Sequence, residues 1–167
     1  NAQVTSQMAQ INTVSGIEKL NTTVAGLNSQ LVQLQALQGA TLVGREVTVN
    51  GDRLSIADGV GVGGFELSGP ADSVKIEILN AGGRVIDTIE LGAQSAGRHG
   101  FAWTPPVGVD AATGDRFRVV AKNGAANVGF TPLMRDRVDA VIAGGDTLTL
   151  ELRNSGSVPY DQIRAFN

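Results

Sequence analysis

The sequence contains no cysteine and only one histidine, His99. Without cysteine the chain cannot be one of the small domains held together by disulfides, and it cannot build a structural zinc site from thiolates. His99 is therefore the only side chain that could supply an imidazole or thiolate ligand to a metal ion. We therefore expect no metal site.

Charge is also scarce, and it is spread unevenly. Charged residues make up 17% of the chain, against roughly a quarter in ordinary globular domains. Residues 1–39 hold only Glu18 and Lys19. The net charge is -3 and no basic stripe is present, which argues against nucleic acid as a partner.

Long apolar runs are missing as well. None approaches the roughly 20 residues that a membrane-spanning helix needs, so we expect no membrane insertion. The first residues lack the charged and then apolar pattern of a cleavable signal peptide. They open abruptly in a helical pattern, so we expect that a preceding segment is missing.

A heptad pattern dominates the N-terminal region. Apolar residues recur at alternating spacings of three and four, which is typical of the a and d positions of a coiled coil. Met8, Ile11 and Val14 continue the apolar face upstream but leave that register. The helix should end near Gly39. The predicted oligomerisation residues, called the seam below, are Ile17, Leu20, Val24, Leu27, Leu31 and Leu34.

An isolated helix cannot bury this seam. Covering six such side chains contributes on the order of 10 kcal/mol, at roughly 1.5–3 kcal/mol each. Ordering about 20 backbone residues costs at least as much. The seam therefore needs a partner, either the chain's own β region or other copies of the helix. The flanking positions are uncharged, which suits a helix enclosed by similar helices: Asn21, Thr23, Asn28 and Gln30.

After Gly39 the apolar period changes from helical spacing to alternation, which indicates short strands separated by turns. "DSVKIEIL" and "RVIDTIEL" flank "NAGG" and predict a hairpin, and "GGD" at 144–146 predicts another tight turn. Turn signals every 8 to 12 residues are typical of a sandwich or barrel.

The sequence offers weak candidates for chemistry. "GVGVGG" matches a dinucleotide-binding fingerprint through Gly59, Gly61 and Gly64, but a strand and a turn follow it instead of a helix. A flexible loop between strands is the better interpretation. Hence we expect no cofactor.

The titratable residues fit structural roles better than catalytic ones. His99 lies in an alternating stretch beside Phe101 and Trp103, which we expect in the core. Asp110 and Asp115 suit turns in which the carboxylate accepts from its own backbone. The last pair, Asp136 and Asp139, falls on opposite faces of a regular strand, and "RDR" at 135–137 suggests a solvated edge. We therefore expect no catalytic residue, no small-molecule substrate and no enzyme.

Two stretches carry a family resemblance that covers about a third of the chain. "TSQMAQINTVSGIEKLNTTV" at 5–24 has a core similar to "SQLAQ-ST-EQ-EKLN", and a later stretch is similar to a "GxVV" turn followed by "LGxxxAGxHxFxW". Both are typical of the flagellar hook-capping (FlgD) family, which the chain resembles. After Trp103 the sequence departs from the family pattern, with Phe117 at a tyrosine's packing position.

The resemblance implies a mainly β fold with an N-terminal helix. Residues 1–39 would be the oligomerisation helix, and residues 40–67 with 129–167 would form a Tudor-like small barrel. A fibronectin type III-like sandwich at 68–128 would be inserted in that barrel. The Gly, Asn and Pro residues of "LSGPADS" and "NGAANVG" mark joints at both ends of the insert.

The resemblance also implies a function. Similar proteins leave the bacterium through the flagellar secretion apparatus without a cleaved signal, and they form an oligomeric cap at the tip of the growing hook. Hook protein subunits assemble under that cap. The residues alone leave an alternative open, an extracellular β-sandwich binding or adhesion module with a helical stalk.

Overall fold

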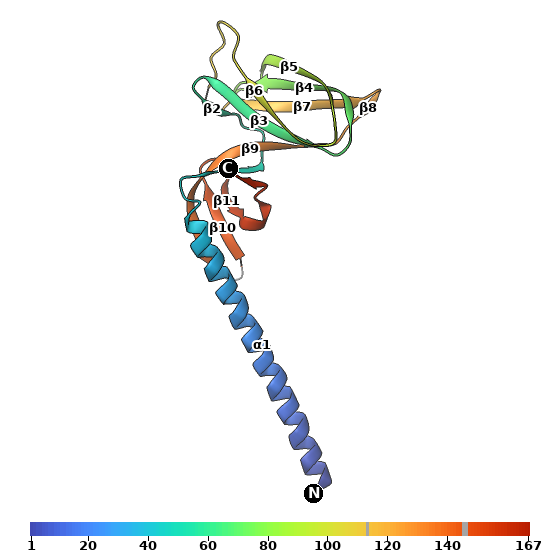
Figure 1. The fold of residues 1–167 in the computed structure, drawn as a ribbon, viewed down its shortest axis with the longest axis vertical. Coiled ribbons are helices and arrows are strands. Elements are labelled where there is room, and N and C mark those ends of the chain that lie inside the picture. Colours follow the sequence, from blue (N-terminus) through green and yellow to red (C-terminus); the bar gives the residue numbers. More distant parts are fainter. Residues whose placement is uncertain (113, 145–146) are drawn as a thin grey trace.

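The chain forms one long helix followed by a β region. In the computed structural model, residues 1–112, 114–144 and 147–167 are described. Helix α1 covers Ala2–Ala40, so its predicted end near Gly39 is confirmed. It projects away from the β region, and the N-terminus lies at its far tip (Figure 1). The turn predicted at 144–146 falls partly outside the described residues.

Only the last turns of α1 contact the β region. Val32 and Gly39 are its buried residues. Gly39 lies so close to strands β9 (Phe130–Gly144) and β10 (Thr147–Leu152) that a Cβ at this position would be 3.0 Å from Val141 Cγ1. The missing side chain lets the helix end pack directly on the sheet. Gly44, at a φ of 85°, then turns the chain into the first strand.

Five strands in the order β11-β10-β9-β1-β12 form the unit next to the helix, called the five-stranded unit. Its strands are β1 (Glu46–Asn50), β9 (Phe130–Gly144), β10 (Thr147–Leu152), β11 (Gly156–Pro159) and β12 (Ala165–Phe166), with a 3-10 turn at Tyr160–Gln162. All these strand pairs are antiparallel. The core consists of Val47, Val49, Met134, Val138, Leu150 and Leu152.

A β-sandwich lies beyond the five-stranded unit (Figure 1). One layer contains β2 (Ser55–Ala57), β3 (Val60–Leu67) and β6 (Gly97–Trp103). The other has the order β5-β4-β7-β8 and consists of β4 (Ala71–Leu79), β5 (Val85–Gln94), β7 (Arg116–Asn123) and β8 (Ala126–Asn127). Trp103, Phe65 and Phe117 are its largest fully buried side chains. The prediction that Trp103 is a core residue is therefore confirmed.

Strand β9 belongs to both units. Its first part pairs with β3 and its next part with β1, and Leu133 pairs with both Gly64 and Asn50. The C-terminal segment adds a second tie, because Arg164 forms an ion pair of 2.7 Å with Glu66 of β3. Arg98 of β6 also donates to the Arg164 carbonyl at 3.2 Å. The two β units are thus joined by continuous backbone pairing as well as by side chains.

The division between the units differs from the predicted one. Residues 40–67 were assigned to the barrel, but Leu54, Phe65 and Leu67 lie in the sandwich core. Strand β3 pairs with β6 along its full length, from Gly61 opposite Trp103 to Leu67 opposite Gly97. The Gly and Pro residues at 69–70 therefore mark a corner inside the sandwich. They do not mark the start of a domain.

The glycine-rich stretch is a strand, and the expectation of a flexible loop is wrong for it. A Cβ on Gly63 would lie 2.6 Å from Phe101 Cζ, and one on Gly61 would lie 3.0 Å from Trp103 Cε3. These glycines make room for the large rings of the core. Only Gly59, at a φ of 78°, occupies a turn conformation that favours glycine.

We expect Gly63→Ala to destabilise the sandwich by about 1–3 kcal/mol, because the added methyl group overpacks the ring of Phe101. The matched control is Gly100→Ala on the neighbouring strand, where the nearest atom to a new Cβ is 3.9 Å away. Urea unfolding followed by Trp103 fluorescence measures both variants. Equal midpoints would contradict the role assigned to Gly63.

Candidate interaction surfaces

The candidate chemical residues have structural roles in the β region. Among the described residues, no group of three or more His, Cys, Asp or Glu side chains could hold a metal ion. The His99 ring lies 2.8 Å, at Nε2, from the Ser95 carbonyl oxygen and stacks on Phe65 with centroids 5.4 Å apart. Asp115 is buried and accepts from the Ala112 amide at 2.9 Å, as expected for a turn acid.

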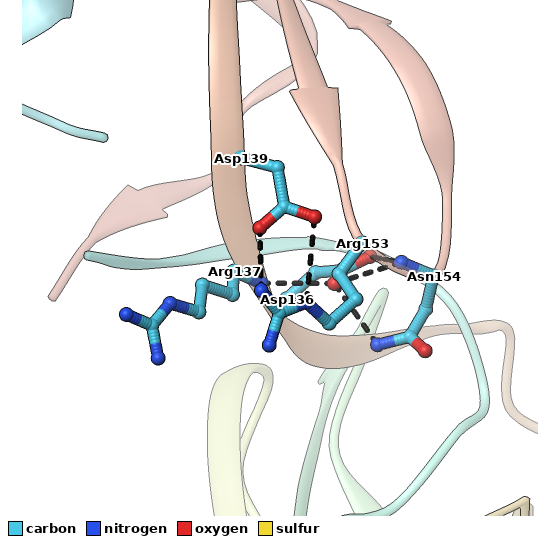
Figure 2. A network of polar contacts seen from close by, with 5 residues as sticks. All are labelled: Asp136, Arg137, Asp139, Arg153 and Asn154. Carbon is cyan, nitrogen blue, oxygen red and sulfur yellow. Dashed lines mark hydrogen bonds and ion pairs between the residues drawn. The ribbon is translucent and has the colours of Figure 1, made fainter. Parts of the chain in front are cut away.

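Asp136 is the polar residue that sequence reasoning missed. It is 3% exposed, although "RDR" suggested a solvated edge. Its carboxylate accepts from the Ser155 amide at 2.8 Å, the Ser155 hydroxyl at 2.7 Å and the Asn154 side-chain amide at 3.0 Å. The backbone amides of Asn154 and Arg137 donate to it as well (Figure 2). The carboxylate thus fixes the turn between β10 and β11 against β9.

Asp139 points the other way, as the alternation of the strand predicts. It is exposed and accepts two hydrogen bonds from the Arg153 guanidinium, the shorter at 2.8 Å (Figure 2). This hydrogen bonding and the charge of Asp139 raise the pKa of Arg153 above its ordinary value. The two acids therefore do not form a catalytic pair.

The seam is exposed along its whole length. Each of its six side chains keeps at least half of its surface open: Ile17 52%, Leu20 65%, Val24 63%, Leu27 55%, Leu31 58% and Leu34 59%. Since a helix turns about 100° per residue, these positions fall within an arc of about 100° on one face. The structure therefore brings the predicted residues together as a continuous apolar strip.

The β region of the same chain does not cover the seam. The helix contacts β9 and β10 through Val32 and Gly39, whose side of the helix lies about 100° from the centre of the seam. Leu31 and Leu34 lie in the same turns of the helix as this contact but face away from it, and both remain exposed. Of the two partners that the sequence allowed, the chain's own β region is therefore not the one seen here.

The polar flanks of the seam satisfy part of their hydrogen bonding within the helix. The hydroxyl of Thr23 donates to the Lys19 carbonyl at 2.8 Å. Such groups can be covered by an apolar neighbour without leaving a donor unpaired. Glu18 and Lys19, the only charges of α1, lie off the seam at b and c positions. The surface thus suits contact with another uncharged helix.

Within the described residues, none of the helices combines the length and hydropathy required to cross a bilayer. Basic residues, which help amphipathic helices to lie on anionic membrane surfaces, are represented in α1 by Lys19 alone. A protein partner fits the composition better.

Comparisons with known proteins agree on one family. A family model described as the FlgD Ig-like domain matches residues 51–126, which include β2 to β7. The basal-body rod modification protein FlgD of Salmonella typhimurium is 36% identical over 175 residues, covering 98% of this chain and 75% of that protein. The Escherichia coli protein of the same name is 37% identical, with 98% and 76% covered.

Solved structures show the same likeness. FlgD from P. aeruginosa superposes with a TM-score of 0.64 and 25% identity, covering 75% of this chain and 98% of that one. FlgD from Xanthomonas campestris, described as giving insights into hook capping essential for flagellar assembly, has a TM-score of 0.60 and 28% identity, with 80% and 99% covered. The sandwich is thus Ig-like, and the Tudor-like character of the five-stranded unit stays a prediction.

Proposed function

Because this chain belongs to the FlgD family of basal-body rod modification proteins, we propose that it is a hook-capping scaffold of the bacterial flagellum. The observation that carries the proposal is the exposed seam on α1. It is found in a chain similar to a FlgD structure described in terms of hook capping. A cap acts by holding subunits in place, so it needs binding surfaces and no bond-making site.

The helix is the assembly element of this proposal. Its seam associates with the seams of other copies and joins several chains into one cap. Ile17 and Val24 at a positions with Leu20 and Leu27 at d positions favour few helices, whereas Leu31 at an a position relaxes that preference. Because the flanks of the seam are uncharged, salt bridges do not select the number of copies in the assembly. Side-chain packing at the seam sets that number.

The β units are the elements that meet hook protein. They lie at the opposite end of the chain from the N-terminal tip of α1 (Figure 1), so an assembly held by helices presents them as a ring of β units around its axis. Their joint through β9 lets a force on the sandwich reach the helix base. In this proposal the protein is exported by the flagellar secretion apparatus and acts outside the cell at the hook tip.

The adhesion-module alternative has less support. A sugar-binding surface usually offers an exposed Trp or Tyr ring, but Trp103 is 1% exposed and Tyr160 is half-buried against Phe166. The helix is also poorly suited to a stalk that only spaces two domains, since a spacer gains nothing from an uninterrupted apolar strip.

Replacing Leu20 and Leu27 by aspartate in the source bacterium tests the proposed function. We expect cells that carry this variant of the complete protein to lack hooks in electron micrographs and to lose motility, because the cap does not assemble. A strain with Thr22→Asp and Ser29→Asp, on the face opposite the seam, should form hooks. Normal hooks with the seam variant at native expression would contradict the proposal.

A further inference from the structure

A cleft lies where the sandwich and the five-stranded unit meet, and we call it the junction cleft. Its volume is about 290 Å³, and residues of β1, β3, β6 and β9 line it. The sandwich contributes Arg98, and the five-stranded unit contributes Thr48 and Arg135, which are paired across β1 and β9. Pockets for cofactors and other small molecules usually measure roughly 300–1,000 Å³. The junction cleft is therefore of a size that suits one or two side chains of a protein partner.

Two glycines form part of its floor. Gly64 of β3 and Gly100 of β6 stand opposite each other in the ladder, and both line the cleft. Gly63 makes room for the ring of Phe101 in the core, but Gly100 points to the outer face and is exposed. Within the described chain, the nearest atom to a Cβ on Gly100 would be the Gly63 carbonyl oxygen, 3.9 Å away. A strand glycine under open space often marks a place where another backbone or a ligand approaches closely.

The charges at the cleft are positive and only partly neutralised. Arg98 is exposed, and its guanidinium donates to the Arg164 carbonyl at 3.2 Å without an ion pair to any described carboxylate. Glu66, which stands opposite Arg98 in the ladder, instead pairs with Arg164 at 2.7 Å. Arg135 has a long ion pair of 3.8 Å with Glu46, and both side chains are about half exposed. No acidic residue is found among the described residues that line the cleft.

The neutral polar group at the cleft also favours an acceptor. The Thr48 hydroxyl oxygen accepts from Asn167 Nδ2 at 3.0 Å, so its own hydrogen is available to a partner. Guanidinium groups bind carboxylates through short, charge-assisted hydrogen bonds. Nucleic acid fits less well, because the chain has a net charge of -3 and no basic stripe to follow a phosphate backbone. An acidic side chain therefore complements the cleft best.

We propose that the junction cleft receives an acidic side chain from an extended segment of a hook protein subunit. The backbone of that segment lies over the glycine floor, and its carboxylate reaches Arg98 and Arg135. This inference rests on the proposed function and names the contact surface for it. Because the cleft belongs to the β units and contains no residue of α1, this contact leaves the seam free.

Filling the floor of the cleft tests the inference without changing any charge. Gly100→Leu places a side chain in the open space above β6, away from the core. Its matched control is Thr88→Leu, which adds an exposed leucine on β5 in the other layer. Binding of the complete protein to immobilised hook protein of the source bacterium is measured by surface plasmon resonance. We expect Gly100→Leu to bind about tenfold more weakly or worse, and the control to bind like the parent.

Removing the cations is the second test, and it does not depend on how a leucine is tolerated. Arg98→Gln with Arg135→Gln should weaken binding by about tenfold or more, because charge-assisted hydrogen bonds are lost. The control, Arg84→Gln with Lys122→Gln, makes the same charge change at exposed positions outside the cleft. Added salt should weaken the parent and this control more than the test variant.

Two results would overturn the inference. One is parent-like affinity of both the Gly100→Leu variant and the double arginine variant, and the other is a parent protein that does not bind hook protein. Neither result decides the proposed function, because hook formation in cells with the seam variant tests that function separately. Hook capping would then stand with its contact surface elsewhere on the β units.

Discussion

Replacing both Leu20 and Leu27 by aspartate is expected to convert the assembled protein into single chains. Each copy then loses two apolar contacts worth about 1.5–3 kcal/mol each, and it brings two carboxylates into an apolar interface. The contact loss alone corresponds to association that is at least roughly 100-fold weaker. Size-exclusion chromatography with light scattering measures the mass directly.

The controls for this experiment come from the same helix. Thr22→Asp with Ser29→Asp has the same spacing and the same added charge, but both positions lie opposite the seam. This variant should keep the parent mass, and the far-ultraviolet circular dichroism of both variants should match. If the seam variant and the parent share one monomeric mass, the seam is not an assembly surface.

Asp136→Asn is expected to lower the stability of the five-stranded unit by about 3 kcal/mol or more. The carboxylate accepts from five donors in a buried site, and an amide replaces one of its oxygens with a further donor. A buried donor left without an acceptor costs about 1–3 kcal/mol. The groups most affected are the amide and hydroxyl of Ser155, both of which point at Oδ2.

The measurement for Asp136→Asn is urea unfolding with two probes. Trp103 lies in the sandwich and reports that unit, whereas far-ultraviolet circular dichroism reports all the strands. Asp139→Asn on the same strand removes only an exposed ion pair and should cost no more than about 1 kcal/mol. Equal losses for the two variants would contradict the structural role of Asp136.

The helix and its open face were predictable from the sequence. Apolar spacing from Ile17 to Leu34 and the change of period after Gly39 are local signals, which indicate helix and strand from contiguous residues. The paired acids were also separated correctly, because alternation along a strand places Asp136 and Asp139 on opposite faces.

The predicted division between the β units was wrong where it depended on distant pairing. Strand β3 could have joined either unit by its own pattern, and its partner β6 begins some 30 residues later. The glycines at 61 and 63 suggested a loop. Glycine is needed at these positions because the large rings of Trp103 and Phe101 on the paired strand leave no room for a side chain. The residues next to these glycines in the sequence do not show which strand will pair with β3.

By itself, the sequence determined that the N-terminal region is a helix with apolar strips and only two charges, Glu18 and Lys19, since periodicity and composition are properties of contiguous residues. Only the tertiary structure decided which side of that helix its own sheet covers, that β9 serves both β units, and that Asp136 is buried. These depend on which surfaces meet after folding, and packing between residues far apart in the chain is what selects them.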